Sequence, residues 1–205
     1  MLRAIDTVSS LSGQGGASEV ERRAQAAVKQ GDFRPETALS ILEQVDVPFS
    51  TSRPNVTPVG EDKVRSMLLG LYGHGTEYRI TKATLQMPWV TRFLLGFLRK
   101  SLPDFPCTSI QLNVEFASRP HVDRRNFGPS AAIALGSFTG GEIWAEDSEG
   151  ASEQVLTKGD PVGDPFKGTA FDVKNQWLLF DGNRLHFTQP YQGARISLIF
   201  FGVAL

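Results

Sequence analysis

Two of the three histidines in this chain stand in patterns that could bind a metal ion. His121-Val122-Asp123 places an imidazole and a carboxylate two positions apart, on the same side of an extended backbone, so both can reach one ion. His186 follows the turn Asp181-Gly182-Asn183. Two histidines and one carboxylate on one face of an iron ion leave three positions open for a bidentate oxo acid and O₂. By itself, a His-x-Asp pattern also fits a surface turn after Pro120.

Arg195 and Ser197 follow His186 on an apolar segment, Arg195–Val203, which we expect to be the last strand. Arg195 and Ser197 share one face of that strand, and Ile196, Leu198 and Phe200 take the opposite, core-packing face. The planar guanidinium suits the far carboxylate of a dicarboxylic acid, and the serine could add a hydroxyl contact. A surface ion pair is the alternative for Arg195. In so apolar a strand, however, an arginine needs an anionic partner, which a ligand would supply.

The elements that position these residues begin with helices. Helical spacing and end signals predict four helices, over Ser18–Gln30, from Pro35 onward, over Glu61–Leu71 and over Pro88–Ser101. The helix that starts at Pro35 carries Ala38, Ile41, Leu42 and Val45 on one face. Val47–Gly60 contains three prolines and is expected to be a loop or linker. From residue 108 the apolar period changes to two. Short strands are expected at Ile110–Phe116, Ala131–Leu135, Glu142–Ala145, Gly168–Val173, Trp177–Phe180 and Arg195–Val203, with a long hairpin loop at Gly159–Gly168.

Helices followed by a run of short strands indicate an α+β chain whose catalytic half is a sandwich or barrel. We expect a flexible tail over 1–15, a helical extension and linker over 16–60, and the strand-rich domain with its flanking helices over 61–205. No apolar run reaches the length of a membrane span, and the N-terminus lacks the apolar region of a secretory signal. The single cysteine, Cys107, excludes an internal disulfide, so an intracellular location, cytoplasmic or nuclear, is expected.

The net charge of −1 excludes a broadly cationic, non-specific nucleic-acid binder. The charge is uneven: residues 51–130 carry eleven Lys or Arg against six Asp or Glu, and residues 131–205 carry five against nine. A basic middle could face a polyanion, and a solvated surface of uneven charge is the plainer interpretation.

The order His121-x-Asp123, His186 and Arg195-x-Ser197 resembles the Fe(II)/2-oxoglutarate dioxygenase superfamily. Residues 121–126, 140–144 and 180–186 resemble its TET/JBP-like branch most, over about residues 107–203. The resemblance implies a double-stranded β-helix core of the jelly-roll or cupin-like type with N-terminal supporting helices. It also implies Fe(II) held by His121, Asp123 and His186, 2-oxoglutarate as cosubstrate, O₂, and hydroxylation of a substrate C–H bond.

The resemblance assigns roles to further residues. Gln111 and Asn113 share sequence parity with His121, so either could bind 2-oxoglutarate or orient a ligand, or could satisfy backbone groups of the barrel. Asn126 matches the family's asparagine after His-x-Asp, where it could support a ligand or contact substrate. The branch suggests the methyl group of a pyrimidine base in DNA as substrate, which requires base flipping. Phosphates could be neutralised by Lys82, Arg92, Arg119, Arg124 and Arg125, and a base could stack on Phe127, Trp177 or Tyr191, each of which could equally be plain core.

Three alternatives remain open at this stage. A hydroxylase of a small molecule or peptide would use the same chemistry on another substrate. A catalytically silent cupin-like module would hold a metal without turnover, although the metal residues and Arg195 are all present. A hydrolase with a zinc-like site would leave Arg195 and Ser197 unexplained. The oligomeric state is not predicted by the sequence.

Overall fold

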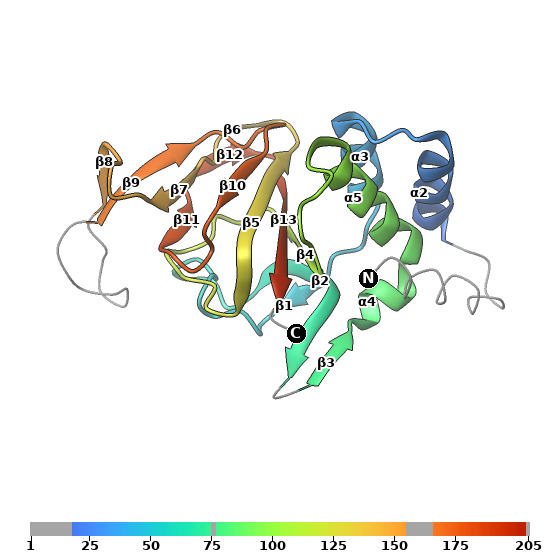
Figure 1. The fold of residues 1–205 in the computed structure, drawn as a ribbon, viewed down its shortest axis with the longest axis horizontal. Coiled ribbons are helices and arrows are strands. Elements are labelled where there is room, and N and C mark those ends of the chain that lie inside the picture. Colours follow the sequence, from blue (N-terminus) through green and yellow to red (C-terminus); the bar gives the residue numbers. More distant parts are fainter. Residues whose placement is uncertain (1–17, 75–76, 155–165, 204–205) are drawn as a thin grey trace.

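The structure, a computed structural model, describes residues 18–74, 77–154 and 166–203. Helices gather on one side of the molecule and a strand-rich sandwich forms the other (Figure 1). The expected tail, 1–15, and most of the expected hairpin loop, 159–168, lie outside the described residues. No helix in the described ranges is long and apolar enough to span a membrane.

Four helices are described: α2 (Glu19–Gln30), α3 (Pro35–Leu42), α4 (Lys82–Gln86) and α5 (Pro88–Ser101). Three of the four helices expected from the sequence are therefore confirmed, and α5 has the expected bounds. Helix α2 begins where Ser18 accepts a hydrogen bond from the backbone N–H of Glu21, and ends at Gly31, whose positive φ of 66° favours glycine. Pro35 and Pro88 occupy first turns, where a missing N–H costs nothing.

The strands form two main antiparallel sheets, described here as major and minor. The major sheet has the order β1 (Phe49–Ser50), β2 (Val64–His74), β4 (Ser109–Val114), β13 (Ile196–Val203), β5 (Asn126–Leu135) and β10 (Leu178–Phe180), with β3 (Glu77–Ile80) paired to β2. The minor sheet has the order β11 (His186–Thr188), β7 (Ile143–Glu146), β9 (Phe166–Phe171) and β8 (Ser152–Gln154). A short ribbon pairs β12 (Tyr191–Gly193) with β6 (Phe138–Gly140).

The pairing of these strands is nested. Strand β4 pairs with β13, the residue His121 pairs with His186 at the start of β11, β5 pairs with β10, and β7 pairs with β9. One long antiparallel hairpin, rolled so that its strands alternate between two sheets, is a jelly roll. The fold is therefore α+β with a double-stranded β-helix core and N-terminal helices, as the sequence predicted.

The expected helix over 61–71 is wrong, because these residues contribute most of strand β2, which lies between β1 and β4. Met67 and Leu69 face the helices, and the hydroxyl of Ser66 reaches Gln111 and Asn113 on the opposite face. A strand that is buried on both faces has apolar residues at spacings that a helix also produces. This misassignment hid Ser66 from the expected site.

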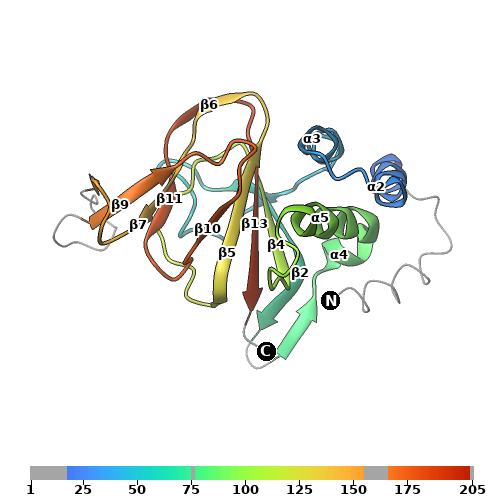
Figure 2. The same cartoon turned by 45° about the horizontal axis from the view of Figure 1, so that its top comes forward.

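The helices pack on the outer face of the major sheet. Helix α5 lies between that sheet and α2 (Figure 2). Apolar residues from segment 16–60, among them Ala24, Ile41 and Leu42, share one buried cluster with Phe93 of α5 and Leu112 of the sheet. The opposite face of the major sheet is thereby left for the site.

Glu21 of α2 caps a different helix, α5. Its side chain is 5% exposed, and its two carboxylate oxygens accept hydrogen bonds from the backbone N–H groups of Trp89 (3.0 Å) and Val90 (2.9 Å). These groups lie in the first turn of α5, where N–H groups have no partner inside the helix, and Met87 supplies no side-chain cap. Burial raises the pKa of Glu21, and the two N–H groups oppose that rise. Glu21 therefore links the N-terminal helices to the domain.

Glu21→Ala should lower the free energy of unfolding by about 1–3 kcal/mol, since two N–H groups at a buried helix end lose their acceptor. The matched control is Glu19→Ala, which removes an exposed pair with Arg22 and should cost within about 0.5 kcal/mol. Urea unfolding followed by circular dichroism measures both. Equal effects of the two substitutions would contradict the capping role.

Candidate active site

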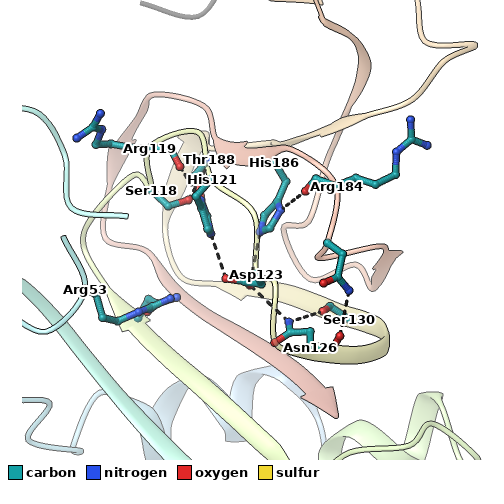
Figure 3. Close-up of polar contacts among 12 residues, drawn as sticks. Arg53, Ser118, Arg119, His121, Asp123, Asn126, Ser130, Arg184, His186 and Thr188 are labelled. Atoms are coloured by element: carbon teal, nitrogen blue, oxygen red, sulfur yellow. Dashed lines mark hydrogen bonds and ion pairs between the residues drawn. The ribbon is translucent and has the colours of Figure 1, made fainter. Parts of the chain in front are cut away.

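Antiparallel pairing brings the two site histidines together across 65 positions of sequence. The N–H of His121 donates to the carbonyl of His186, and the reverse bond also forms, each at 3.0 Å. Their rings lie with centroids 4.2 Å apart. The N–H of Asp123 donates to the carbonyl of Gly182 at 2.7 Å, which fixes the loop after His121 against the turn before His186. The side chains of His121, Asp123 and His186 thus point toward one another (Figure 3).

The three side chains are arranged to hold one metal ion. The Nε2 atoms of His121 and His186 lie 3.8 Å and 3.7 Å from the two oxygens of Asp123, and the potential ligand atoms all lie within 4.8 Å of one another. Both Nδ1 atoms contact backbone carbonyls, of Arg119 (2.6 Å) and Arg184 (2.9 Å). A carbonyl can only accept, so each Nδ1 carries the proton and each Nε2 offers its lone pair.

Electrostatics favour the neutral, metal-binding form of His121. Burial lowers its pKa to about 4, with the charge of His186 as a further cause. A neutral imidazole is the form that binds metal. The donor set of two imidazoles and one carboxylate is that of a non-haem iron site with open positions.

Asn126 and Gly182 support the carboxylate. The amide nitrogen Nδ2 of Asn126 donates to Ser130 (3.1 Å) and, over a longer 3.5 Å, to Oδ2 of Asp123. A Cβ at Gly182 would lie 2.9 Å from the Ser130 hydroxyl and 3.0 Å from Nδ2 of Asn126, so this turn has no room for a side chain. Asn126 therefore lies where the sequence expected an orienting residue.

One cavity of about 690 Å³, its open mouth included, contains the triad. Its polar lining includes Gln111, Asn113, Arg195 and Ser197, the four residues expected to bind a cosubstrate. Its apolar lining consists of Val56, Phe116, Ile143, Phe180, Phe187, Ile199 and Phe201. The cavity thus pairs a metal triad with a largely apolar interior that limits access of water.

Arg195 is buried without a carboxylate partner among the residues that the structure describes. The residue is 3% exposed, Nη2 donates to the carbonyl of Gly141 (3.1 Å), and Nε has no hydrogen bond. The rings of Phe138 and Tyr191 lie 5.4 Å from the guanidinium. Gly141 has a φ of 77°, and a Cβ there would meet Nε at 3.0 Å. Burial lowers the pKa of Arg195 to about 10, so it stays charged near neutral pH.

The side-chain amides of Gln111 and Asn113 on β4 form hydrogen bonds with residues of the neighbouring strand β2. The Nε2 of Gln111 donates to the Ser66 hydroxyl (2.7 Å) and the Met67 carbonyl (2.9 Å). The Oδ1 of Asn113 accepts from the Ser66 hydroxyl (3.1 Å). The expected inward orientation is confirmed, because both residues line the cavity. The contacts of Gln111 match the alternative in which it satisfies barrel groups.

The residues expected to contact substrate are dispersed. Arg124 and Arg125 are exposed beside Asp123 and do not line the cavity. Tyr191 packs on Arg195 and Phe138 rather than into the cavity, so it supports the arginine.

The other expected base-binding and phosphate-binding residues do not line the cavity. The stacking role considered for Trp177 is wrong, because its ring packs against Phe97 and Phe200 in the helix-facing core. Phe127 is exposed on β5. Lys82 and Arg92 belong to α4 and α5, on the helical face of the major sheet, which removes them from the site.

Sequence reasoning missed Arg53, which lines the cavity. It comes from the proline-containing segment expected to be a linker, and its guanidinium points toward Asp123 (Figure 3). No periodicity surrounds Arg53, so no sequence signal placed it there.

No family model matches the sequence, and no curated protein matches it. Similar solved structures include a 2OG-Fe(II) oxygenase family oxidoreductase from Burkholderia pseudomallei, 14% identical over 92% of both chains with a TM-score of 0.49. NgTET1 in complex with 5mC DNA is 17% identical, over 67% of this chain and 60% of that one, with a TM-score of 0.45. A prolyl hydroxylase from Trichoplax adhaerens, in complex with a hypoxia inducible factor peptide fragment, is 14% identical over 89% and 90%, with a TM-score of 0.45. At these values the fold assignment rests on the strand pairing.

Asp123→Ala should weaken binding of Fe(II) or Mn(II) by about 100-fold or more, since even supporting residues of metal sites are worth 10–100-fold. Asp172→Ala, an exposed carboxylate in a turn outside the triad, is the matched control and should bind metal as the wild type does. Anaerobic calorimetric titration measures both, and circular dichroism checks the fold. Undiminished affinity in the Asp123 variant would refute the metal site.

Proposed function

We propose that this protein is an Fe(II)- and 2-oxoglutarate-dependent dioxygenase that hydroxylates a substrate C–H bond. The observation that carries the proposal is the presence, in one cavity, of a His-Asp-His triad and a buried guanidinium with an unsatisfied Nε. A metal triad alone fits several chemistries. The addition of Arg195 restricts the ligand to one with a carboxylate that lies away from its metal-binding end.

The residues present fit both groups. His121, Asp123 and His186 would hold the metal ion, and a set of three protein ligands would leave positions for an oxo acid and O₂. Arg195, one residue before β13, and Ser197 on β13 line the same cavity, where they would hold the far carboxylate of 2-oxoglutarate. When bound, Fe(II) and 2-oxoglutarate supply the oxidising chemistry from O₂. The protein orients the ligands, and its apolar lining limits the access of water to the reacting centre.

Two alternative functions would use the metal triad and Arg195 differently. A silent cupin-like module requires the metal but no turnover, and a zinc-type hydrolase leaves Arg195 without a ligand. Incubation with Fe(II), 2-oxoglutarate, ascorbate and O₂ should release succinate if the protein is a dioxygenase. Absence of succinate with every substrate class, despite metal binding, would favour one of the rivals.

Arg195→Ala should raise the KM for 2-oxoglutarate by roughly 30-fold or more, since loss of one partner of a buried charged pair costs about 2–5 kcal/mol. Arg195→Lys should recover only part of this loss, because an ammonium group cannot reproduce the planar fork. Succinate release against 2-oxoglutarate concentration measures both. If neither variant changes the KM, the carboxylate anchor lies elsewhere.

The substrate is a finer question, for which the TET/JBP-like resemblance suggests a pyrimidine methyl group in DNA. That candidate is supported by the motif over residues 121–126, by Asn126 beside Asp123, and by the exposed Arg124 and Arg125 next to the site. A base would have to be flipped out of the duplex to reach the triad. A small molecule or a peptide is the alternative substrate for the same chemistry.

If DNA is the substrate, oligonucleotide affinity should fall by roughly 0.7–0.9 log unit per log unit of salt for each phosphate contact. Replacing Arg124 and Arg125 together by Ala should flatten that slope, because each arginine that binds a phosphate contributes to it. Glu146→Ala with Glu149→Ala, on the acidic part of the chain, is the control and should leave the slope unchanged. Fluorescence anisotropy measures the slope, and mass spectrometry of digested DNA tests for a hydroxymethyl pyrimidine. Binding that does not depend on salt would argue against DNA.

A further inference from the structure

A second arginine, Arg53, lines the same cavity as Arg195, although the two residues are far apart in the sequence. Arg53 is half-buried, and Figure 3 shows its guanidinium directed toward Asp123. Its Nη1 donates to Oδ1 of Asn113 (3.1 Å) and to the Ser66 hydroxyl (3.3 Å). Within the described ranges, Nε and Nη2 of Arg53 make no hydrogen bond. One edge of the fork is thus anchored to the sheet and the other edge is available to a ligand.

The backbone around Arg53 is fixed as firmly as the side chain. The carbonyl of Arg53 accepts hydrogen bonds from the N–H groups of Val56 (3.1 Å) and Thr57 (3.2 Å) and from the Thr57 hydroxyl (2.8 Å). The carbonyl of Val56 in turn accepts from the N–H of Arg119, two residues before His121. The turn is therefore held against the loop that carries the metal residues, which gives the guanidinium a preset position.

No carboxylate forms an ion pair with Arg53 in the part of the chain that the structure describes. Burial lowers the pKa of Arg53, and the nearby charge of Asp123 opposes that shift. Asp123 is also the only carboxylate that lines the cavity among these residues. A metal ion bound by the triad takes up that negative charge. Arg53 is then left as a cation facing the cavity, which is unfavourable unless a ligand supplies an anion.

The charges in the cavity lead to the same conclusion. Arg53, Arg195 and a divalent ion together carry four positive charges, and Asp123 carries one negative charge. Bound 2-oxoglutarate adds two negative charges, and Arg195 and the metal are the groups that bind its two ends. One positive charge remains, and it is located at Arg53.

We propose that Arg53 determines substrate specificity by binding the carboxylate of a small acidic substrate beside the metal triad. The inference rests on the proposed dioxygenase function and specifies its substrate class. The free edge of the guanidinium, Nε and Nη2, matches the two oxygens of a carboxylate. Arg53 and Arg195 both line the cavity that contains the triad. DNA carries its negative charges on a backbone that stays outside such a cavity, so Arg53 favours the small acid over the base.

The test uses simple probes on the full chain loaded with Mn(II), with and without saturating 2-oxoglutarate. Benzoate and acetate are the carboxylate probes, and benzamide and acetamide are their uncharged counterparts. Thermal unfolding and calorimetry report binding without any turnover. Arg53→Met removes the charge, Arg53→Lys keeps the charge without the fork, and Arg195→Met is the matched control from the same cavity.

The wild type with 2-oxoglutarate should bind and be stabilised by the carboxylates and not by the amides. Arg53→Met should weaken the carboxylate affinity by roughly tenfold or more. Arg53→Lys should give an intermediate value, and it serves as the reporting variant if Arg53→Met does not fold. Arg195→Met should keep the carboxylate response in the absence of 2-oxoglutarate.

Three results would overturn the inference: no difference between acids and amides in the wild type, an unchanged carboxylate response in both Arg53 variants, or a loss of 2-oxoglutarate affinity in Arg53→Met as large as in Arg195→Met. The last result would assign Arg53 to the cosubstrate instead.

Failure of the dioxygenase proposal is a separate outcome. It would appear as no binding of 2-oxoglutarate to the wild type, while the carboxylate comparison between the Arg53 and Arg195 variants still reports on Arg53.

Discussion

The reciprocal backbone pairing of His121 with His186 is the interaction on which the site depends. It holds the segment between β4 and β5 against the start of β11. Its consequence is that two imidazoles and the carboxylate two residues after the first meet within metal-binding distance. The pairing also fixes the loops on either side, so the carbonyls of Arg119 and Arg184 select the same tautomer in both rings. A ligand set that is far apart in sequence is thus preorganised by main-chain hydrogen bonds.

The rest of the fold supports that pairing from two directions. The major sheet carries its polar residues toward the cavity and its apolar residues toward α5, so one face forms the site and the other forms the core. Glu21 and the apolar residues of α2 and α3 hold the helical layer against that core. Burial of the charged Arg195 guanidinium is costly, because such a group is stable only with aromatic rings, carbonyls or an anion around it. The structure supplies the rings of Phe138 and Tyr191 and the carbonyl of Gly141, and the cavity that Arg195 lines can hold the anion.

Much of this arrangement could be predicted from sequence because local signals agreed with the tertiary result. The helical spacing over 18–30, Pro35 at a helix start and the period-two pattern after residue 108 each depend on near neighbours, and each was interpreted correctly. The metal residues, Arg195 and Ser197 were found because residue type, order and spacing together restrict the chemistry.

What could not be predicted depended on burial from both sides or on distant contacts. Strand β2 was mistaken for a helix because both of its faces are covered, so its apolar spacing carries no clear period. Arg53 has no local pattern, and its place in the cavity follows from hydrogen bonds to Ser66 and Asn113, residues far along the chain. The packing partners of Trp177 and Tyr191 could not be predicted either, because the sequence does not tell whether an aromatic side chain packs on the core, an arginine or a ligand.

In the proposed dioxygenase, one cavity binds Fe(II) through the triad and 2-oxoglutarate through the metal and Arg195 together. Anaerobic titration of the Fe(II)-loaded protein with 2-oxoglutarate, followed by visible absorption, tests it most directly, because a chelating oxo acid on Fe(II) produces a charge-transfer band. We expect a saturable band in the wild type, with one 2-oxoglutarate per iron. Fe(II) binding with no such band, at any 2-oxoglutarate concentration, would contradict it.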